Sequence, residues 1–255
     1  MRKLWGTGLL LLVVCFTAVT PGLAQAPAGE KPPVYLYSAE WVVPRAQWAD
    51  MDKLADADKP VLDKLVADGT LVGYGAWSNL MHQAGAPTHG TWFSATSEGK
   101  LLKALEAIYA QPLLVGAPAQ GASKHWDYFL TASVYGSKPG ASGGYLTWSR
   151  WEFQPGQMRS YMELVKKTFV PMLDKLLAEG TITSYGELTE DYHTEKMGVV
   201  FEYFTVPDAA SLDKANDAFE ALFNANPTLM GAVRSMTSPE GHRDYITRLR
   251  FMNNK

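Results

Sequence analysis

Residues 60–75, PVLDKLVADGTLVGYG, recur in the sequence as residues 171–186, PMLDKLLAEGTITSYG. Ten of these sixteen positions are identical, where chance would give about one. The correspondence continues beyond this segment, because the His-x-Asp-Tyr sequence that begins at His125 recurs at His242. An internal repeat on this scale means that the chain holds two copies of one structural unit.

Each copy predicts the same order of secondary structure. An alternating, aromatic-rich strand (34–41 and 144–152) is followed by an amphipathic helix that ends at Gly69 or Gly180. A hairpin, a second helix and the strand with the His-x-Asp-Tyr sequence complete the copy. The order is βαββαβ, twice, which is the ferredoxin-like unit.

The sheet of such a unit has helices on one face only, so its other face must be buried elsewhere. We therefore expect an α+β fold, in which tandem duplicated ferredoxin-like βαββαβ units pack sheet to sheet as a pseudo-dimeric α/β barrel with the helices outside. The expected strand order in each sheet is 4-1-3-2. The expected units are a first repeat at 34–136, a linker at 137–143 and a second repeat at 144–255. The chain would be a monomeric pseudo-dimer, with exposed sheet edges as the route to further self-association.

This arrangement resembles the dimeric α/β-barrel superfamily, with both halves fused in one chain. The resemblance spans residues 34–252 and rests on the element order and on the segment DKLxAxGT…YG. Members of the superfamily include small monooxygenases of antibiotic biosynthesis, stress-responsive barrel proteins, YCII-type proteins and the haem-containing chlorite dismutases. The resemblance implies a fold rather than one activity, because no stretch matches the catalytic signature of any one member.

Residues 1–24 have the features of a secretory signal peptide, with two basic residues, an apolar run and small residues before Ala24. We expect cleavage after Ala24 and a secreted or periplasmic protein with a flexible lead-in at 25–33. Cys15 is the only cysteine and lies inside the leader, so the mature chain is expected to lack disulfides and cysteine metal sites. No other stretch is long enough to span a membrane.

The charge balance bears on the partners of the mature chain. Without residues 1–24 the chain carries 21 basic and 26 acidic side chains, a formal charge of −5. No basic run interrupts this balance, so nucleic-acid binding has no electrostatic support. The expected partner is a small molecule.

The two His-x-Asp-Tyr strands hold the candidate catalytic residues. Residues two apart on a strand share a face, so His125 lies beside Asp127 and His242 beside Asp244. The alternate residues are more apolar and are expected to pack on the helices, which would turn the His–Asp pairs toward the space between the sheets. A carboxylate beside an imidazole raises its basicity, as a general base requires. The alternative is that each pair is a polar anchor at the start of its strand.

The second copy carries charges where the first has small neutral residues. The aligned mid-strand sets are Glu187, Glu202, Arg248 and Arg250 against Ala76, Ser94, Thr131 and Ser133. Arg150 similarly aligns with Glu40. Charges in mid-strand must be paired or must line a wet cavity. We predict one asymmetric pocket between the sheets, in which these charged residues bind the ligand and Trp148 forms an aromatic wall. The alternative is an Arg–Glu network that holds the sheets together.

His82 and His89 flank the tip of the first predicted hairpin, close enough across the strands to share a transition metal. The second copy keeps His193 but has Met197 opposite it. Because no third ligand is present in sequence, we expect an ordinary solvated loop and no metal.

These observations favour a secreted or periplasmic protein that binds an aromatic or anionic small molecule between two sheets, without a cofactor. The resemblance to the superfamily implies alternatives. A cofactor-independent oxygenase, or a proton-transfer enzyme of the isomerase or lyase kind, would use a His–Asp pair as its base. A haem-binding protein would use His125 or His242 as axial ligand, with the neighbouring Asp as its hydrogen-bond partner. A structural or interaction module would need no pocket.

Overall fold

The structure is a computed structural model that describes residues 31–110, 117–192 and 196–255. The predicted signal peptide, most of the predicted lead-in and His193 lie outside these residues. Within them, no helix combines the length and the apolar character that crossing a membrane requires.

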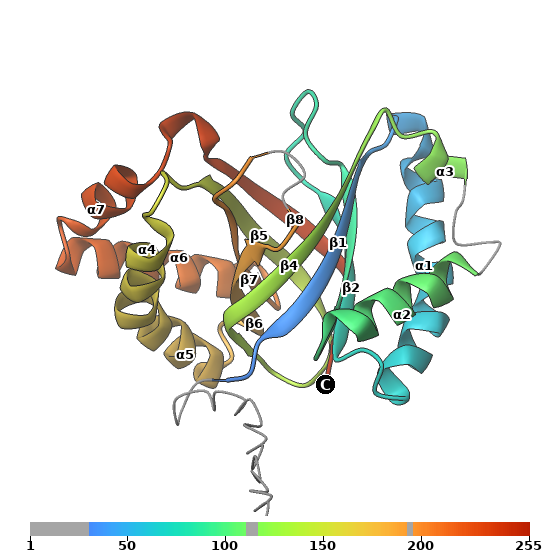
Figure 1. The fold of residues 1–255 in the computed structure, drawn as a ribbon, viewed down its shortest axis with the longest axis horizontal. Helices are drawn as coiled ribbons and strands as arrows, with labels where there is room; N and C mark the ends of the chain where they lie inside the picture. The colour runs from blue at the N-terminus through green and yellow to red at the C-terminus, as the bar shows by residue number, and fades with distance from the viewer. Residues whose placement is uncertain (1–30, 111–116, 193–195) are drawn as a thin grey trace, which may run out of the picture. The chain divides into compact units, whose positions relative to one another are not determined.

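Eight strands of the described residues close into one antiparallel barrel (Figure 1). They are β1 (Val34–Val42), β2 (Gly73–Asn79), β3 (His89–Ala95), β4 (Lys124–Ser137), β5 (Gly140–Glu152), β6 (Ser184–Glu190), β7 (Val199–Val206) and β8 (Arg243–Asn254). Around the barrel they follow the order β1-β3-β2-β8-β5-β7-β6-β4. Each repeat therefore contributes four neighbouring strands in the predicted 4-1-3-2 order, and the two sets join at β2–β8 and β4–β6.

Closure of the barrel corrects one expectation. The outer strands of each four-stranded set pair with the other set, so the described barrel leaves no strand edge for another chain. The prediction of self-association assumed exposed sheet edges, and that assumption is wrong for the described barrel. One chain closes the barrel alone, and a monomer in solution stays a prediction.

The helices lie outside the barrel, in two groups on opposite sides of it (Figure 1). Those of the first repeat are α1 (Trp48–Ala67), α2 (Glu98–Tyr109) and α3 (Ala117–Gln120). Those of the second are α4 (Met158–Leu164), α5 (Val170–Glu179), α6 (Ala209–Ala225) and α7 (Leu229–Met236). Gly69 and Gly180, with φ of 79° and 81°, take the left-handed conformation predicted at the ends of α1 and α5.

The prolines of the two first helices lie in different surroundings. Pro60 lies inside α1, whereas Pro171 stands in the first turn of α5, directly after a π-helical segment, η2 (Val165–Phe169). A π-helical turn holds one residue more than an α-helical turn. The sequence from Trp151 to Pro171 is one residue longer than that from Trp41 to Pro60. The second repeat therefore accommodates its extra residue in η2.

Contacts within each half explain why the segment DKL…YG recurs. The Tyr74 hydroxyl donates a hydrogen bond to Asp63, and the Tyr185 hydroxyl donates one to Asp174 at 2.6 Å. Each bond ties the first helix of a repeat to its second strand. The repeated Asp and Tyr are thus a matched pair that fixes how the helix lies on the sheet.

The glycine after each tyrosine makes room for a ring inside the barrel. A Cβ atom on Gly75 would lie 2.8 Å from the Trp92 indole, and one on Gly186 would lie 2.7 Å from the Tyr203 ring. In both cases the ring belongs to the residue directly opposite on the neighbouring strand. Glycine is therefore required here because a cross-strand aromatic ring covers its Cα.

The strand faces that line the barrel interior are the opposite of those predicted. Tyr128 and Leu130 of β4, with Tyr245 and Leu249 of β8, pack inside the barrel. The prediction that the His–Asp pairs face the space between the sheets is therefore wrong, and they lie on the helix side. Both faces of these strands are covered, so an apolar face does not by itself indicate which side the helices take.

The pairing register also corrects the alignment of the repeats at the third strand. Phe93 pairs with the first strand of its repeat at the position equivalent to that of Phe204. Thr91 and Glu202 likewise occupy equivalent positions. Glu202 therefore corresponds to Thr91 and not to Ser94.

Candidate functional site

A cavity of about 640 Å³ lies between the sheet of the second repeat and helices α4 to α7. This volume is within the range of about 300–1,000 Å³ that small-molecule sites occupy. The helices give it a mainly apolar wall that includes Phe169, Leu173, Phe219, Phe223 and Val233. The strands and the start of β8 give it polar groups, namely Ser149, Glu187, Glu202, His242 and Asp244.

Two carboxylates face each other in this cavity. Glu187 of β6 and Glu202 of β7 are direct cross-strand partners. Burial raises the pKa of Glu187 well above its usual range and raises the pKa of Glu202 to about 7. The Tyr161 hydroxyl, on α4, donates a hydrogen bond of 3.2 Å to Glu187. No cation from the described residues forms an ion pair with either carboxylate.

His242 lies at the edge of the same cavity. Its Nε2 is 2.9 Å from Oδ2 of Asp244, while its Nδ1 is buried with no hydrogen-bond partner among the described residues. Its ring stacks on the Trp151 indole, with 3.6 Å between ring centroids. Ser149 donates a hydrogen bond of 2.6 Å to the other carboxylate oxygen of Asp244. The imidazole is thus held in place on one side and left open on the other.

The first repeat has the same arrangement at its surface. His125 Nε2 lies 3.1 Å from Asp127, and the His125 ring stacks on Trp41 with centroids 5.0 Å apart. His125 is exposed and does not line the cavity. The His-x-Asp-Tyr sequence therefore recurs with a common Trp–His–Asp geometry, and only the second copy of it borders the cavity. A catalytic role for either pair stays a prediction.

Side-chain size explains the position of the cavity. Thr147, which lines it, takes the place that Tyr37 has in the first repeat. Tyr37 packs in the core between sheet and helices there, and its hydroxyl reaches Asp127. The shorter threonine leaves that space unfilled.

Two residues of the site were missed by sequence reasoning. Tyr161 lies on the apolar stripe of the helix, and only its hydroxyl distinguishes it from a core residue. Arg234 lines the cavity from α7, a helix that the predicted βαββαβ order does not contain. The sequence feature that did indicate this site was the pair of charged residues in mid-strand, Glu187 and Glu202.

The arginines predicted to bind an anion between the sheets lie elsewhere. Arg248 is exposed, with its guanidinium carbon 5.2 Å from the centre of the Tyr145 ring. Arg250 binds two carboxylates of α1, Asp52 at 3.1 Å and Asp56. The predicted placement of these arginines is therefore wrong, and a role in ligand binding stays a prediction.

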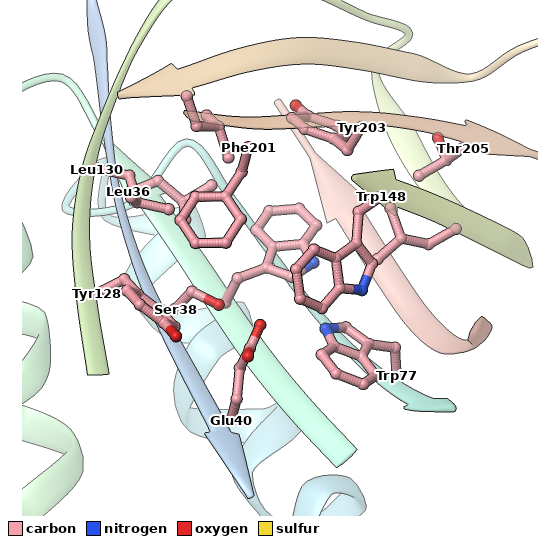
Figure 2. A pocket seen from close by; sticks show the side chains of 13 residues that line it. Leu36, Ser38, Glu40, Trp77, Tyr128, Leu130, Trp148, Phe201, Tyr203 and Thr205 are labelled. Carbon is pink, nitrogen blue, oxygen red and sulfur yellow. The ribbon is translucent and has the colours of Figure 1, made fainter. Parts of the chain in front are cut away.

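The space inside the barrel is filled mainly by aromatic rings (Figure 2). Trp148 lies 5.9 Å from Trp77 and 5.8 Å from Phe201, between ring centroids. A pocket of about 60 Å³ remains among the rings. The predicted pocket between the sheets is present and has Trp148 in its wall, but Glu187 and Glu202 do not line it, and the larger volume lies on the helix side.

Glu40 is the carboxylate of this inner pocket. Burial raises its pKa to about 8, against the opposing charge of Arg150. Arg150 itself binds Glu152 at 2.8 Å, so an Arg–Glu pair does stand at this end of the barrel. It does not involve Glu187 or Glu202.

The two hairpin histidines contact one indole. The rings of His82 and His89 lie 4.5 Å and 5.5 Å from that of Trp48, between centroids. Thr88 lies 3.0 Å from Nδ1 of His89, and Asp52 lies 3.8 Å from its Nε2. Both ring nitrogens of His89 therefore have polar neighbours within the protein.

Known structures share this fold at low sequence identity, whereas no family model and no curated protein matches the sequence. A proposed monooxygenase from Lactobacillus acidophilus matches with a TM-score of 0.61 and 8% identity, over 88% of this chain and 97% of its own. An anthrone oxidase-like protein matches with a TM-score of 0.56 and 11% identity, over 88% and 94%. A haem-binding protein from Thermus thermophilus matches with a TM-score of 0.51 and 10% identity, over 85% and 90%.

These likenesses correct one expectation and support another. The prediction of no cofactor is corrected, because a haem-binding protein stands among the structures that share the fold, and the fold therefore gives no ground for expecting that a cofactor is absent. The resemblance inferred from the repeated segment is supported at the level of the fold. The chain has the mixed α/β fold of the dimeric α/β barrels, closed here by a single polypeptide.

Proposed function

We propose that the chain binds haem in the cavity between the second-repeat sheet and helices α4 to α7. The observation that carries the proposal is the buried, unpartnered Nδ1 of His242, a residue that lines this cavity of about 640 Å³. Buried polar atoms nearly always have a partner. An imidazole nitrogen without one, beside a large cavity, has the chemistry of an iron ligand.

Other residues of the cavity fit the same ligand. Asp244 holds the second nitrogen of His242, which orients the ring. Phe219 and Phe223 offer apolar surface to a flat macrocycle, and Arg234 offers a cation to a propionate. Haem, when bound, supplies redox chemistry at its iron.

The two glutamates are compatible with this ligand because of their altered pKa values. Burial raises the pKa of Glu187 well above its usual range and leaves Glu202 half-protonated near pH 7. These two carboxyl groups therefore carry less negative charge against a haem with anionic propionates than ordinary glutamates would. These carboxyl groups are positioned to donate or accept a proton at a bound ligand.

Titration of the purified chain with haemin tests the proposal. We expect a saturable shift of the Soret absorbance, and His242→Ala should lower the affinity at least about tenfold through loss of the iron ligand. His125→Ala, the matched change in the first repeat, should leave the affinity unchanged. No spectral shift, or equal loss of affinity in both variants, would refute the proposal.

A second candidate function, proton transfer on a bound small molecule, is favoured by the Glu187–Glu202 pair. A carboxyl group with a pKa of about 7 serves well as a general acid or base at neutral pH. Carbon-13 NMR of labelled glutamate should show Glu202 titrating near pH 7 and Glu187 titrating well above the usual range of a glutamate. Independent titration near the usual value for both groups would remove this candidate.

The origin and export of the chain are further parts of the proposal. We infer that duplication of one βαββαβ unit produced the repeats at 34–136 and 144–255, as their matching element order supports. We also propose export with cleavage after Ala24. N-terminal sequencing of the protein recovered from the cell exterior or periplasm tests the cleavage site.

A further inference from the structure

The pocket inside the barrel has the composition of an aromatic cage with a carboxylate in its wall. Its rings come from strands of both repeats, namely Trp77, Trp92, Tyr128, Trp148, Phe201 and Tyr203. Figure 2 shows the Glu40 side chain reaching from β1 toward the indoles of Trp77 and Trp148. This pocket lies on the other face of the sheet from the cavity proposed for haem.

The backbone holds two of these rings in fixed positions. A Cβ atom on Gly90 would overlap the Trp77 indole, and one on Gly75 would lie 2.8 Å from Trp92. Each glycine is the direct cross-strand partner of the tryptophan that covers it. The indole faces are therefore placed before any ligand arrives, which lowers the entropic cost of binding.

Glu40 has no counter-ion in this pocket. Its side chain is buried, and no described residue forms an ion pair or hydrogen bond with it. Arg150 is the cation whose charge reaches it, but the Arg150 guanidinium is bound to Glu152 at 2.8 Å. The indole nitrogen of Trp148 is also buried, with no hydrogen-bond partner in the part of the chain that the structure describes. A buried carboxylate without a counter-ion is unfavourable, so a cation from outside the chain would be stabilised beside it.

We propose that the barrel interior binds a small alkylammonium cation, with its charge placed between the Glu40 carboxylate and the faces of the surrounding indoles. Aromatic faces attract cations through the ring quadrupole, and tryptophan does so most strongly. A carboxylate in the same wall adds a full opposite charge. This site does not depend on the proposed binding of haem.

The volume of the pocket sets the size of the ligand. The pocket of about 60 Å³ has room for about four to six water molecules. A methylated ammonium group fits this space, whereas a longer chain must extend out of the barrel. Ser38, Trp92, Tyr128 and Tyr203 are only half-buried, so the pocket can be reached from solvent.

The charge of Glu40 determines how binding depends on pH. The ionisable groups that face it are Arg150 of β5, Tyr245 of β8 and the wall residues Tyr128 and Tyr203. Burial raises the pKa of Tyr203 and Tyr245, so both stay neutral below pH 10. The pKa of Glu40 is about 8, so below this pH a cation must displace a proton. Affinity should therefore rise with pH and level off above about 8.

Titration of the full chain with tetramethylammonium chloride, followed by tryptophan fluorescence and calorimetry, tests the proposal. We expect saturable binding at pH 8.5 and at least about tenfold weaker binding at pH 6. Neutral tert-butanol, which has a similar shape, should not saturate the signal, and neither should sodium chloride at equal ionic strength. Glu40→Gln should lower the affinity at least about tenfold, whereas Glu187→Gln, which changes a buried carboxylate outside the barrel, should not.

The aromatic wall provides an independent measurement. Trp148→Phe retains a ring face and should weaken binding less than Trp148→Leu, which keeps an apolar side chain without one. Equal binding of tert-butanol and tetramethylammonium, or affinity that does not change with pH, would overturn the proposal and leave an ordinary aromatic core. The pH profile and the tert-butanol comparison use the unmodified chain, so they decide the question even where a variant fails to fold.

Discussion

The Tyr37 hydroxyl donates a hydrogen bond of 2.5 Å to Oδ1 of Asp127. In the second repeat the place of Tyr37 is taken by Thr147, and Asp244, the counterpart of Asp127, accepts instead from Ser149 at 2.6 Å. The carboxylate keeps a hydroxyl donor in both repeats. In the first repeat the hydroxyl belongs to the large side chain of Tyr37. In the second repeat it belongs to the small side chain of Ser149, so the volume that the Tyr37 ring fills is open and forms part of the cavity.

Thr147→Tyr should fill the cavity. The new ring would occupy the space that Tyr37 fills in the first repeat, so we expect haemin affinity to fall at least about tenfold and stability to change by no more than about 1 kcal/mol. Spectroscopic titration and urea unfolding measure the two effects. Thr147→Ser, which keeps the cavity open, is the control, and wild-type affinity in Thr147→Tyr would mean that haemin binds elsewhere.

Stability should fall as pH rises through the range in which the buried glutamates ionise. The pKa of Glu202 is about 7 in the folded chain against 4.5 ordinarily, so between these values the folded state holds a proton that the unfolded state has lost. Its contribution to the unfolding free energy then decreases by up to about 1.4 kcal/mol per pH unit. Urea unfolding at pH 5 and 7.5 should show a smaller fall in Glu202→Gln. Glu220→Gln, at an exposed position, should match wild type, and an unchanged slope in Glu202→Gln would contradict the assignment.

Gly90→Ala should destabilise the barrel. The added Cβ would overlap the Trp77 indole, which must then move within a packed interior. We expect a loss of about 1–3 kcal/mol in the free energy of unfolding and a shift in tryptophan emission. Gly99→Ala, at a helical position of α2 with no atom near the added methyl, should retain or slightly raise stability. Equal stability of the two variants would show that Trp77 is free to move.

Arg250→Met should affect stability rather than haemin affinity. The change removes the bridge from β8 to Asp52 and Asp56 and leaves two like charges one helical turn apart on α1. We expect a loss of about 1 kcal/mol, smaller at high salt, with unchanged haemin affinity. Arg248→Met, which removes a stacked but unbridged arginine, is the matched comparison. A large loss of haemin affinity in Arg250→Met would restore the arginine to the binding site.

The fold could be predicted because the two halves of the sequence contain the same short segment, and that segment specifies local structure. The segment DKL…YG contains a helix–strand bond and a glycine that a cross-strand ring covers, and both are visible as identities between copies. Strand order followed from the βαββαβ order alone. Local residue types thus determined the arrangement of elements without any knowledge of long-range contacts.

The location of the site could not be predicted in the same way. Glu187 and Glu202 were recognised as unusual, but a barrel strand is covered on both faces, so periodicity does not tell inside from outside. The pairing register of β8 with β2 also shifts at Arg250, which binds Asp52 of α1, and residue type gives no sign of this shift. A cavity forms where the side chains of neighbouring elements leave space, as they do around Thr147. That space depends on three-dimensional packing, which the sequence does not display.

The π-helical segment Val165–Phe169 lets the second repeat absorb a single codon. In an uninterrupted α-helix, one added residue would turn the preceding part by about 100° relative to the part that follows. Tyr161 lies before the segment and Leu173 after it, and both line the cavity. The wider turn therefore takes up the extra residue while both side chains keep facing the cavity. A change of one triplet in the gene can thus be accommodated within one helical turn, without any rearrangement of strands or loops.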